Sequence, residues 1–117
     1  MKFSEVKKLL DAEVLCCEKE LEGEAKSAFG SDMMSDVLAF VKDQSILLTG
    51  LVNPQTVRTA QMMDIRCIVF VRGKRPNEAV IELAQENGIL LLATECRMYT
   101  ACGILYSNGL FAEEVNT

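Results

Sequence analysis

Residues 67–94 read CIVFVRGKRPNEAVIELAQENGILLLAT and decide the fold. The run 67–71 is continuously apolar, as is typical of a strand that is buried on both faces in a parallel sheet. Residues 77–86 then place apolar side chains on one helical face and glutamates on the other. Asn87 and Gly88 predict the end of that helix, and 89–93 is a second apolar strand. This strand–helix–strand unit predicts two parallel strands joined by a right-handed crossover.

The rest of the chain continues the alternation of helices and strands. A helix is expected to begin at Phe3 and another at Pro54, which suits the first helical turn. The remaining expected elements are strands over 13–17, 25–30 and 46–49, a loop over 18–24, and helices over 34–41 and after Thr94. The sequence therefore predicts one layered α/β domain over residues 1–112, with a mainly parallel sheet and flanking helices. Residues 113–117 are expected to form a flexible tail.

The composition excludes several classes of partner. The 117 residues carry a formal net charge of −5, whereas a surface that binds nucleic acid needs a basic face. The apolar runs are far shorter than the roughly 20 residues that cross a bilayer. Residues 1–14 have scattered charges and lack the apolar core of a signal peptide. We therefore expect a cytoplasmic protein with no nucleic-acid or membrane partner.

Standard catalytic and metal-binding motifs are missing from the sequence. The chain has five cysteines, no CxxC pair and no histidine, which predicts free thiols and no metal site. The lack of histidine also excludes proteases that use a histidine base. A P-loop would need Gly and Ser or Thr where the chain has Ile68 and Arg75, and no GxGxxG follows a strand. We expect a non-enzymatic protein without a cofactor.

Polar residues and glycines gather where the predicted parallel strands end. Ligands of open α/β sheets bind beyond the carboxyl ends of the strands. Helix N-termini near Asn53 and Thr94 would present free N–H groups to an anion there, and Arg72 would add positive charge. In the alternative interpretation, Asn53 and Thr94 only cap helices and Arg72 is solvated. The predicted site for a small anionic ligand consists of Thr49, Gly50, Asn53, Arg72, Gly73 and Thr94.

Residues 31–40 read SDMMSDVLAF and predict the start of a helix. Ser31 or Asp32 can accept a hydrogen bond from a free backbone N–H group in the first helical turn. Apolar residues at positions 34, 37, 38 and 41 then form a stripe with helical spacing. The two Ser-Asp pairs are thus explained by structure without any chemistry.

The same segment carries a family resemblance. GSDMMSDVLA, at 30–39, is similar to the SDLLSDVL-type segment of small stand-alone DRTGG-domain proteins. The similarity continues through ILLTG at 46–50, Asn53, CIVF at 67–70, NGILLLAT at 87–94 and LY at 105–106, and so extends from about residue 3 to residue 110. At the place of the motif that names the family, the chain reads TGLVNP over 49–54.

The resemblance implies a fold like the N-terminal domain of HPr kinase/phosphorylase. Family members stand alone, or occur beside nucleotide-sensing CBS domains or on phosphate acetyltransferases, which implies regulation or assembly. The chain resembles only the non-catalytic domain, so kinase activity is not implied. We expect a regulatory or ligand-sensing module for a small anionic metabolite or nucleotide. The alternatives are a structural dimerisation domain and a small enzyme that acts on a phosphorylated metabolite through Asp32, Asp36 and Arg72.

The surplus of large apolar side chains predicts a homodimer. Half of the residues are apolar and only 25% are charged. Met-rich and aromatic surfaces are favoured at interfaces, and a two-fold contact is the commonest way to cover them. The predicted interface is the segment around Met33, Met34, Val37 and Phe40.

Overall fold

Five strands form one sheet in the computed structural model, which describes residues 1–41 and 45–112. The order across the sheet is β1-β5-β4-β3-β2; β2 to β5 are parallel, and β1 pairs antiparallel with β5 at one edge. The predicted mainly parallel sheet is therefore confirmed. The strands are β1 (Glu13–Cys16), β2 (Ser27–Gly30), β3 (Ser45–Thr49), β4 (Cys67–Phe70) and β5 (Leu90–Ala93).

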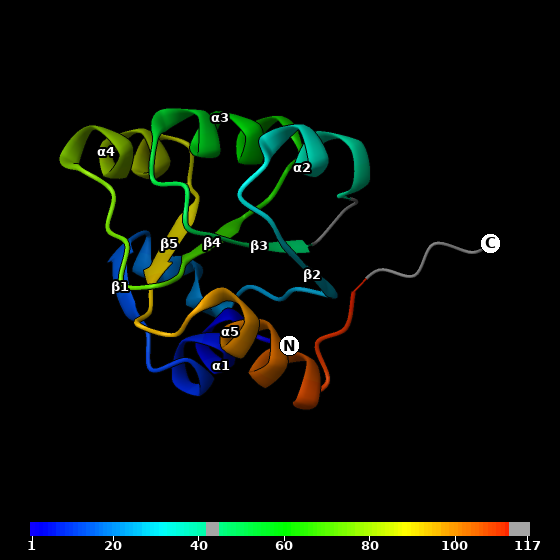
Figure 1. Ribbon diagram of the computed structural model, residues 1–117. Coiled ribbons are helices and arrows are strands. Elements are labelled where there is room, and N and C mark those ends of the chain that lie inside the picture. The colour runs from blue at the N-terminus through cyan, green and yellow to red at the C-terminus, as the bar shows by residue number, and fades with distance from the viewer. Residues whose placement is uncertain (42–44, 113–117) are drawn as a thin grey trace.

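Helices cover both faces of the sheet (Figure 1). One face carries α2 (Met34–Phe40), α3 (Pro54–Met62) and α4 (Glu78–Glu86), and the other carries α1 (Phe3–Leu9) and α5 (Met98–Ser107). Each parallel connection runs through a helix, as parallel strands require. The layered α/β domain with flanking helices that the sequence predicts is confirmed. The expected tail over 113–117 lies outside the described residues.

The core has two halves, one on each side of the sheet. Successive side chains of a strand point to opposite faces, so Cys67 and Val69 pack toward α1 and α5, whereas Ile68 and Phe70 pack toward α2, α3 and α4. All four side chains are fully buried. The continuous apolar runs in the sequence thus reflect strands that are covered on both faces.

Two local elements differ from the expectation. The expected loop over 18–24 contains a 3-10 helix, η1 (Glu18–Glu22). The helix α5 begins at Met98, with Arg97 at the N-cap position, so Thr94 does not cap it. Among the described residues, no helix is both long and apolar enough to cross a membrane.

Buried thiols make the stability of the fold sensitive to alkaline pH. Burial raises the pKa of Cys67 well above its ordinary value of 9.0, and burial raises the pKa of Cys16 to about 12. Both thiols are therefore neutral in the folded state at pH values where the unfolded chain already ionises. Their contribution to stability is complete below about pH 9 and is lost as pH rises through and above that value.

We expect Cys67→Val to remove one of these two contributions. In urea titrations between about pH 8 and pH 10.5, the free energy of unfolding of the wild type should fall more steeply than that of the variant. The difference in slope should approach one proton per molecule, and the raised pKa values of Cys16 and Cys102 should contribute to the slope that remains. Identical slopes in the two proteins would show that Cys67 does not ionise on unfolding.

Candidate functional site

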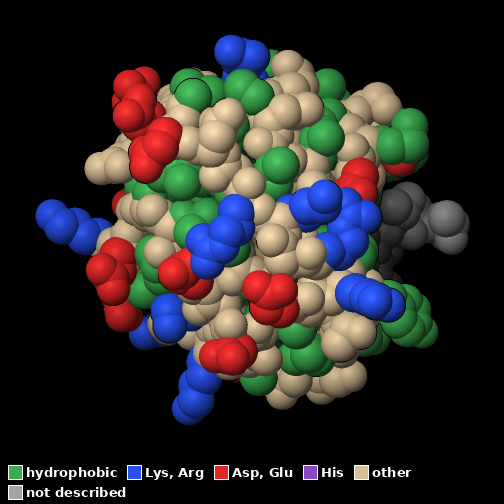
Figure 2. All heavy atoms as spheres, turned by 60° about the vertical axis from the view of Figure 1, so that its left-hand side comes forward, with side chains coloured by type: hydrophobic (Ala, Val, Ile, Leu, Met, Phe, Trp, Pro, Cys, Tyr) green, Lys and Arg blue, Asp and Glu red, His purple; other side chains and the backbone are tan. Residues whose placement is uncertain are grey.

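Three loops meet at the carboxyl edge of the parallel strands. They follow β3, β4 and β5 and lead into α3, α4 and α5. The arrowhead of β5 points toward the left-hand side of Figure 1, and Figure 2 brings that side forward. Acidic and basic side chains are interleaved on this face, so no single sign of charge dominates it. The overall charge of this face therefore does not favour an anion at any one place on it.

Asp32 connects the end of β2 to the loop that follows β3. Its Oδ1 atom accepts hydrogen bonds from the N–H group of Gly50 at 2.7 Å and from Oγ1 of Thr49 at 3.1 Å. The same Thr49 oxygen accepts a hydrogen bond from the N–H group of Leu51 at 3.1 Å. The carboxylate and the hydroxyl together fix the backbone of the turn between β3 and α3.

The guanidinium of Arg72 lies directly over this turn. Its Nη2 atom is 3.4 Å from Oδ2 of Asp32, and both side chains are nearly half exposed. A Cβ atom at position 50 would collide with the guanidinium, so Gly50 is what allows Arg72 to lie against the backbone. Arg72 itself has φ 62°, a conformation that costs a residue with a side chain about 1–3 kcal/mol. Its N–H group donates to the carbonyl of Cys96 at 2.8 Å, which holds this conformation.

The N-terminus of α3 adds free donors beside Arg72. Asn53 is exposed and occupies the N-cap position, but its side chain forms no capping hydrogen bond. None of the hydrogen bonds formed among residues 1–41 and 45–112 uses the N–H groups of Val52, Asn53 or Gln55. The guanidinium of Arg72 lies against Gly50, and the free N–H groups follow Gly50 at the start of α3; both kinds of donor are suited to a small anion.

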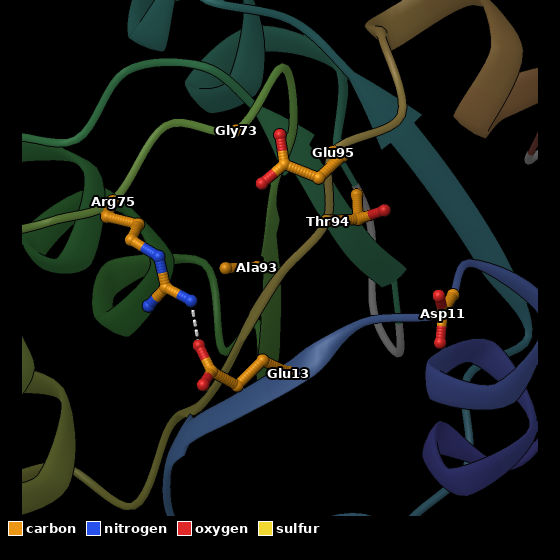
Figure 3. Close-up of a pocket in the computed structure, with 7 residues that line it drawn as sticks. All are labelled: Asp11, Glu13, Gly73, Arg75, Ala93, Thr94 and Glu95. Carbon is orange, nitrogen blue, oxygen red and sulfur yellow. Dashed lines mark hydrogen bonds and ion pairs between the residues drawn. The ribbon is translucent and has the colours of Figure 1, made fainter.

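Gly73 and Thr94 line a different, acidic pocket of about 240 Å³ (Figure 3). Three carboxylates contribute to its walls, from Asp11, Glu13 and Glu95. One guanidinium, that of Arg75, also lies there and forms an ion pair with Glu13. The surplus of negative charge opposes binding of an anion in this pocket.

The side chain of Thr94 has a structural role. It is buried, and its Oγ1 atom donates to the carbonyl of Leu10 at 2.7 Å and accepts from the N–H group of Cys96 at 3.2 Å. The N–H group of Gly73 donates to the carbonyl of Thr94 at 3.0 Å. Neither residue offers a free donor, and both line the acidic pocket. Four of the six predicted residues, namely Thr49, Gly50, Asn53 and Arg72, lie together around the β3–α3 turn.

The expectation that Ser31 or Asp32 caps α2 is wrong, because α2 has no side-chain cap hydrogen bond. The N-cap position of α2 is held by Met33, and Ser31 accepts the hydrogen bond of the Met33 N–H group at 3.0 Å. Asp32 is thus free to bind across the sheet edge, a contact for which its sequence neighbours give no signal. Asp36 lies in the first turn of α2 and forms no ion pair with Arg72 among the described residues.

The predicted interface is split between core and surface. Met34 and Val37 are buried against the sheet, so they are core residues rather than interface residues. Helical spacing turns the intervening side chains outward: Met33 and Phe40 are 61% and 63% exposed, and Leu38 is 41% exposed. The exposed large apolar side chains on or next to α2 are therefore Met33, Leu38 and Phe40.

Comparison with models of protein families matches residues 5–107 to the DRTGG domain. The chain belongs to the DRTGG domain family. A search of curated proteins found no match. Among solved structures, this DRTGG domain is similar to the CBS and DRTGG domains of the regulatory region of Clostridium perfringens pyrophosphatase, crystallised with the activator diadenosine tetraphosphate. The TM-score is 0.69 at 19% identity, and the match covers 86% of this chain and 44% of the other. The likeness confirms the fold of the DRTGG domain.

Proposed function

We propose that this DRTGG domain is a non-catalytic regulatory module that senses a small anionic metabolite or nucleotide. Family membership supports a regulatory role, because the similar pyrophosphatase segment is a regulatory region. The activator bound by that region is a nucleotide with four phosphates, which is an anion. The match covers less than half of that chain, so the class of ligand is carried over as part of this proposal.

The observation that carries the proposal is the position of Arg72 over the β3–α3 turn. Its partner is a half-exposed carboxylate at 3.4 Å, and an exposed ion pair of this kind is worth only about 0–1 kcal/mol. A phosphate group can therefore replace Asp32 as the partner of Arg72 at small cost. It would gain a charge-assisted hydrogen bond from the guanidinium and further bonds from the free N–H groups of Val52, Asn53 and Gln55.

A binding role fits the turn better than catalysis. One oxygen of Asp32 already accepts two hydrogen bonds, and the other faces Arg72. A general base needs an oxygen within reach of the proton it removes. The residues of the turn thus hold one another in place, and Arg72 and the free N–H groups are the donors that a ligand would meet.

Two variants test the anion site without altering the core. Arg72→Ala removes the cation, and Gly50→Ala keeps every charge while its methyl group displaces the guanidinium. We expect pyrophosphate to raise the melting temperature of the wild type and both variants to bind it at least about tenfold more weakly, because a charge-assisted contact is worth about 1.5–3 kcal/mol.

Arg66→Ala is the matched control for charge and for a lost ion pair. Arg66 forms an exposed pair with Glu20 at 3.2 Å, far from the carboxyl edge, and its removal should leave pyrophosphate affinity unchanged. Equal losses of pyrophosphate affinity in Arg66→Ala and Arg72→Ala would show that only the net charge of the protein matters. That result would reject the site. Phosphoester turnover that disappears in Asp32→Asn would favour an enzyme instead.

A second proposal is that the domain forms a homodimer through the exposed side of α2. The observation that favours it is the exposure of three large apolar side chains, Met33, Leu38 and Phe40, on or next to one short helix. We expect sedimentation at micromolar concentration to show a dimer, and Met33→Glu with Phe40→Glu to dissociate it. Met62→Glu is the control, since Met62 is 69% exposed on α3. A 13 kDa monomer in the wild type would overturn the proposal.

A further inference from the structure

A second cavity lies on the opposite side of the sheet from α2, α3 and α4. It has a volume of about 180 Å³ and is enclosed by β2, β3, α5 and the segment that follows α5. Its floor consists of three leucines that are almost fully buried, Leu48, Leu105 and Leu110. The small side chain of Ala28 and the bare backbone of Gly30 keep its wall open.

The close approach of β2 to α5 shapes one end of this cavity. A Cβ atom at position 30 would lie 2.9 Å from Sγ of Cys102 and 3.2 Å from Sδ of Met98. Gly30 therefore lets the strand approach the helix, and Cys102 lines the cavity beside it. The ring of Tyr106 stands at the opening and packs edge-on against Phe111, with ring centroids 4.8 Å apart.

No residue that lines this cavity carries a formal charge. Burial raises the pKa of the Cys102 thiol, so its sulfur is neutral at pH 7. Backbone N–H groups along β2 point alternately toward β3 and away from it. The N–H of Ala28 points away from β3 and donates to the carbonyl of Phe111 at 3.3 Å. The N–H of Gly30, two residues on, points to the same open side. A charged ligand would lose its hydration here without a counter-ion, whereas a neutral ring would not.

We propose that this cavity binds one neutral aromatic molecule, between a single ring and a fused pair of rings in size. An apolar cavity of about 150 Å³ is large enough to bind benzene, and this one is larger. The ring would lie on the leucine floor beside Cys102, and Gly30 N–H would be the donor for one acceptor on its edge. This site is separate from the anion site in position and chemistry and does not depend on it.

Titration with indole, followed by amide chemical shifts, tests the assignment. We expect saturable shifts at Ala28, Gly30 and Cys102, and no binding of indole-3-carboxylate, which carries a charge. Ala28→Leu should fill the cavity and weaken indole binding at least about tenfold. Ala79→Leu is the matched control, because Ala79 is exposed on α4 on the other face of the sheet, and it should bind indole like the wild type.

Cys102 provides a second readout that needs no folded variant. Saturating indole should slow the alkylation of Cys102 by N-ethylmaleimide severalfold, while Cys96, which is also partly exposed, should react at an unchanged rate. Absence of saturable shifts in the wild type, or unchanged indole affinity in a folded Ala28→Leu variant, would overturn the proposal. An unprotected Cys102 would overturn it as well, even if Ala28→Leu does not fold.

Discussion

Phe70→Ala is expected to lower the free energy of unfolding by about 3–5 kcal/mol. Phe70 ends the central strand β4 and is fully buried between the sheet and the layer of α2, α3 and α4. Truncation removes most of a large apolar side chain and leaves a cavity in a position fixed by strands on both sides. The loss would be a large fraction of the 5–15 kcal/mol that stabilises a typical domain.

Urea denaturation of the variant beside Phe40→Ala isolates this effect. Phe40 is 63% exposed on α2, so the same chemical change there should alter the free energy of unfolding by no more than about 0.5 kcal/mol in the monomer. Similar losses in the two variants would mean that the two-sided core does not centre on β4.

Thr94→Val is expected to destabilise the protein by about 1–3 kcal/mol while leaving anion binding intact. Valine keeps the shape of threonine but cannot donate to the carbonyl of Leu10 or accept from the N–H group of Cys96. The carbonyl of Leu10 would lose this partner in a buried position, and the N–H group of Cys96 would lose it in a partly buried one. The junction between α1 and β1 would therefore weaken, whereas the turn around Gly50 would keep its contacts.

Thr100→Val provides the comparison, because Thr100 is exposed on α5. Its free energy of unfolding should match that of the wild type within about 0.5 kcal/mol. Loss of pyrophosphate affinity in a folded Thr94→Val variant would show that Thr94 does contribute to the ligand site.

The sequence predicts the elements of this fold well, because burial on two faces leaves continuous apolar runs. The runs in β4 and β5 contain no polar residue, and the helical spacing of α4 is regular. The direction of β1 could not be predicted, since local spacing identifies a strand but not its partner. Its antiparallel pairing with β5 brings Glu13 beside Ala93 and helps to form the acidic pocket.

The site was only partly predictable for the same reason. The rule that ligands bind at strand ends located Thr49, Gly50, Asn53 and Arg72 together. The same rule could not distinguish these four residues from Thr94. The hydroxyl of Thr94 donates to the carbonyl of Leu10 at the end of α1, which is far away in sequence. The contact of Asp32 with Gly50 also joins distant segments, and no pattern within either segment encodes it.

The central claim is that a small anion binds at the β3–α3 turn beside Arg72. Titration of the ¹⁵N-labelled protein with pyrophosphate, read out as amide chemical-shift changes, tests it most directly. We expect saturable shifts that are largest at Gly50, Val52, Asn53, Gln55 and Arg72, and that are absent in Gly50→Ala. Shifts centred on Gly73, Thr94 and Glu95 at the acidic pocket, or no saturable shift at any amide, would contradict it.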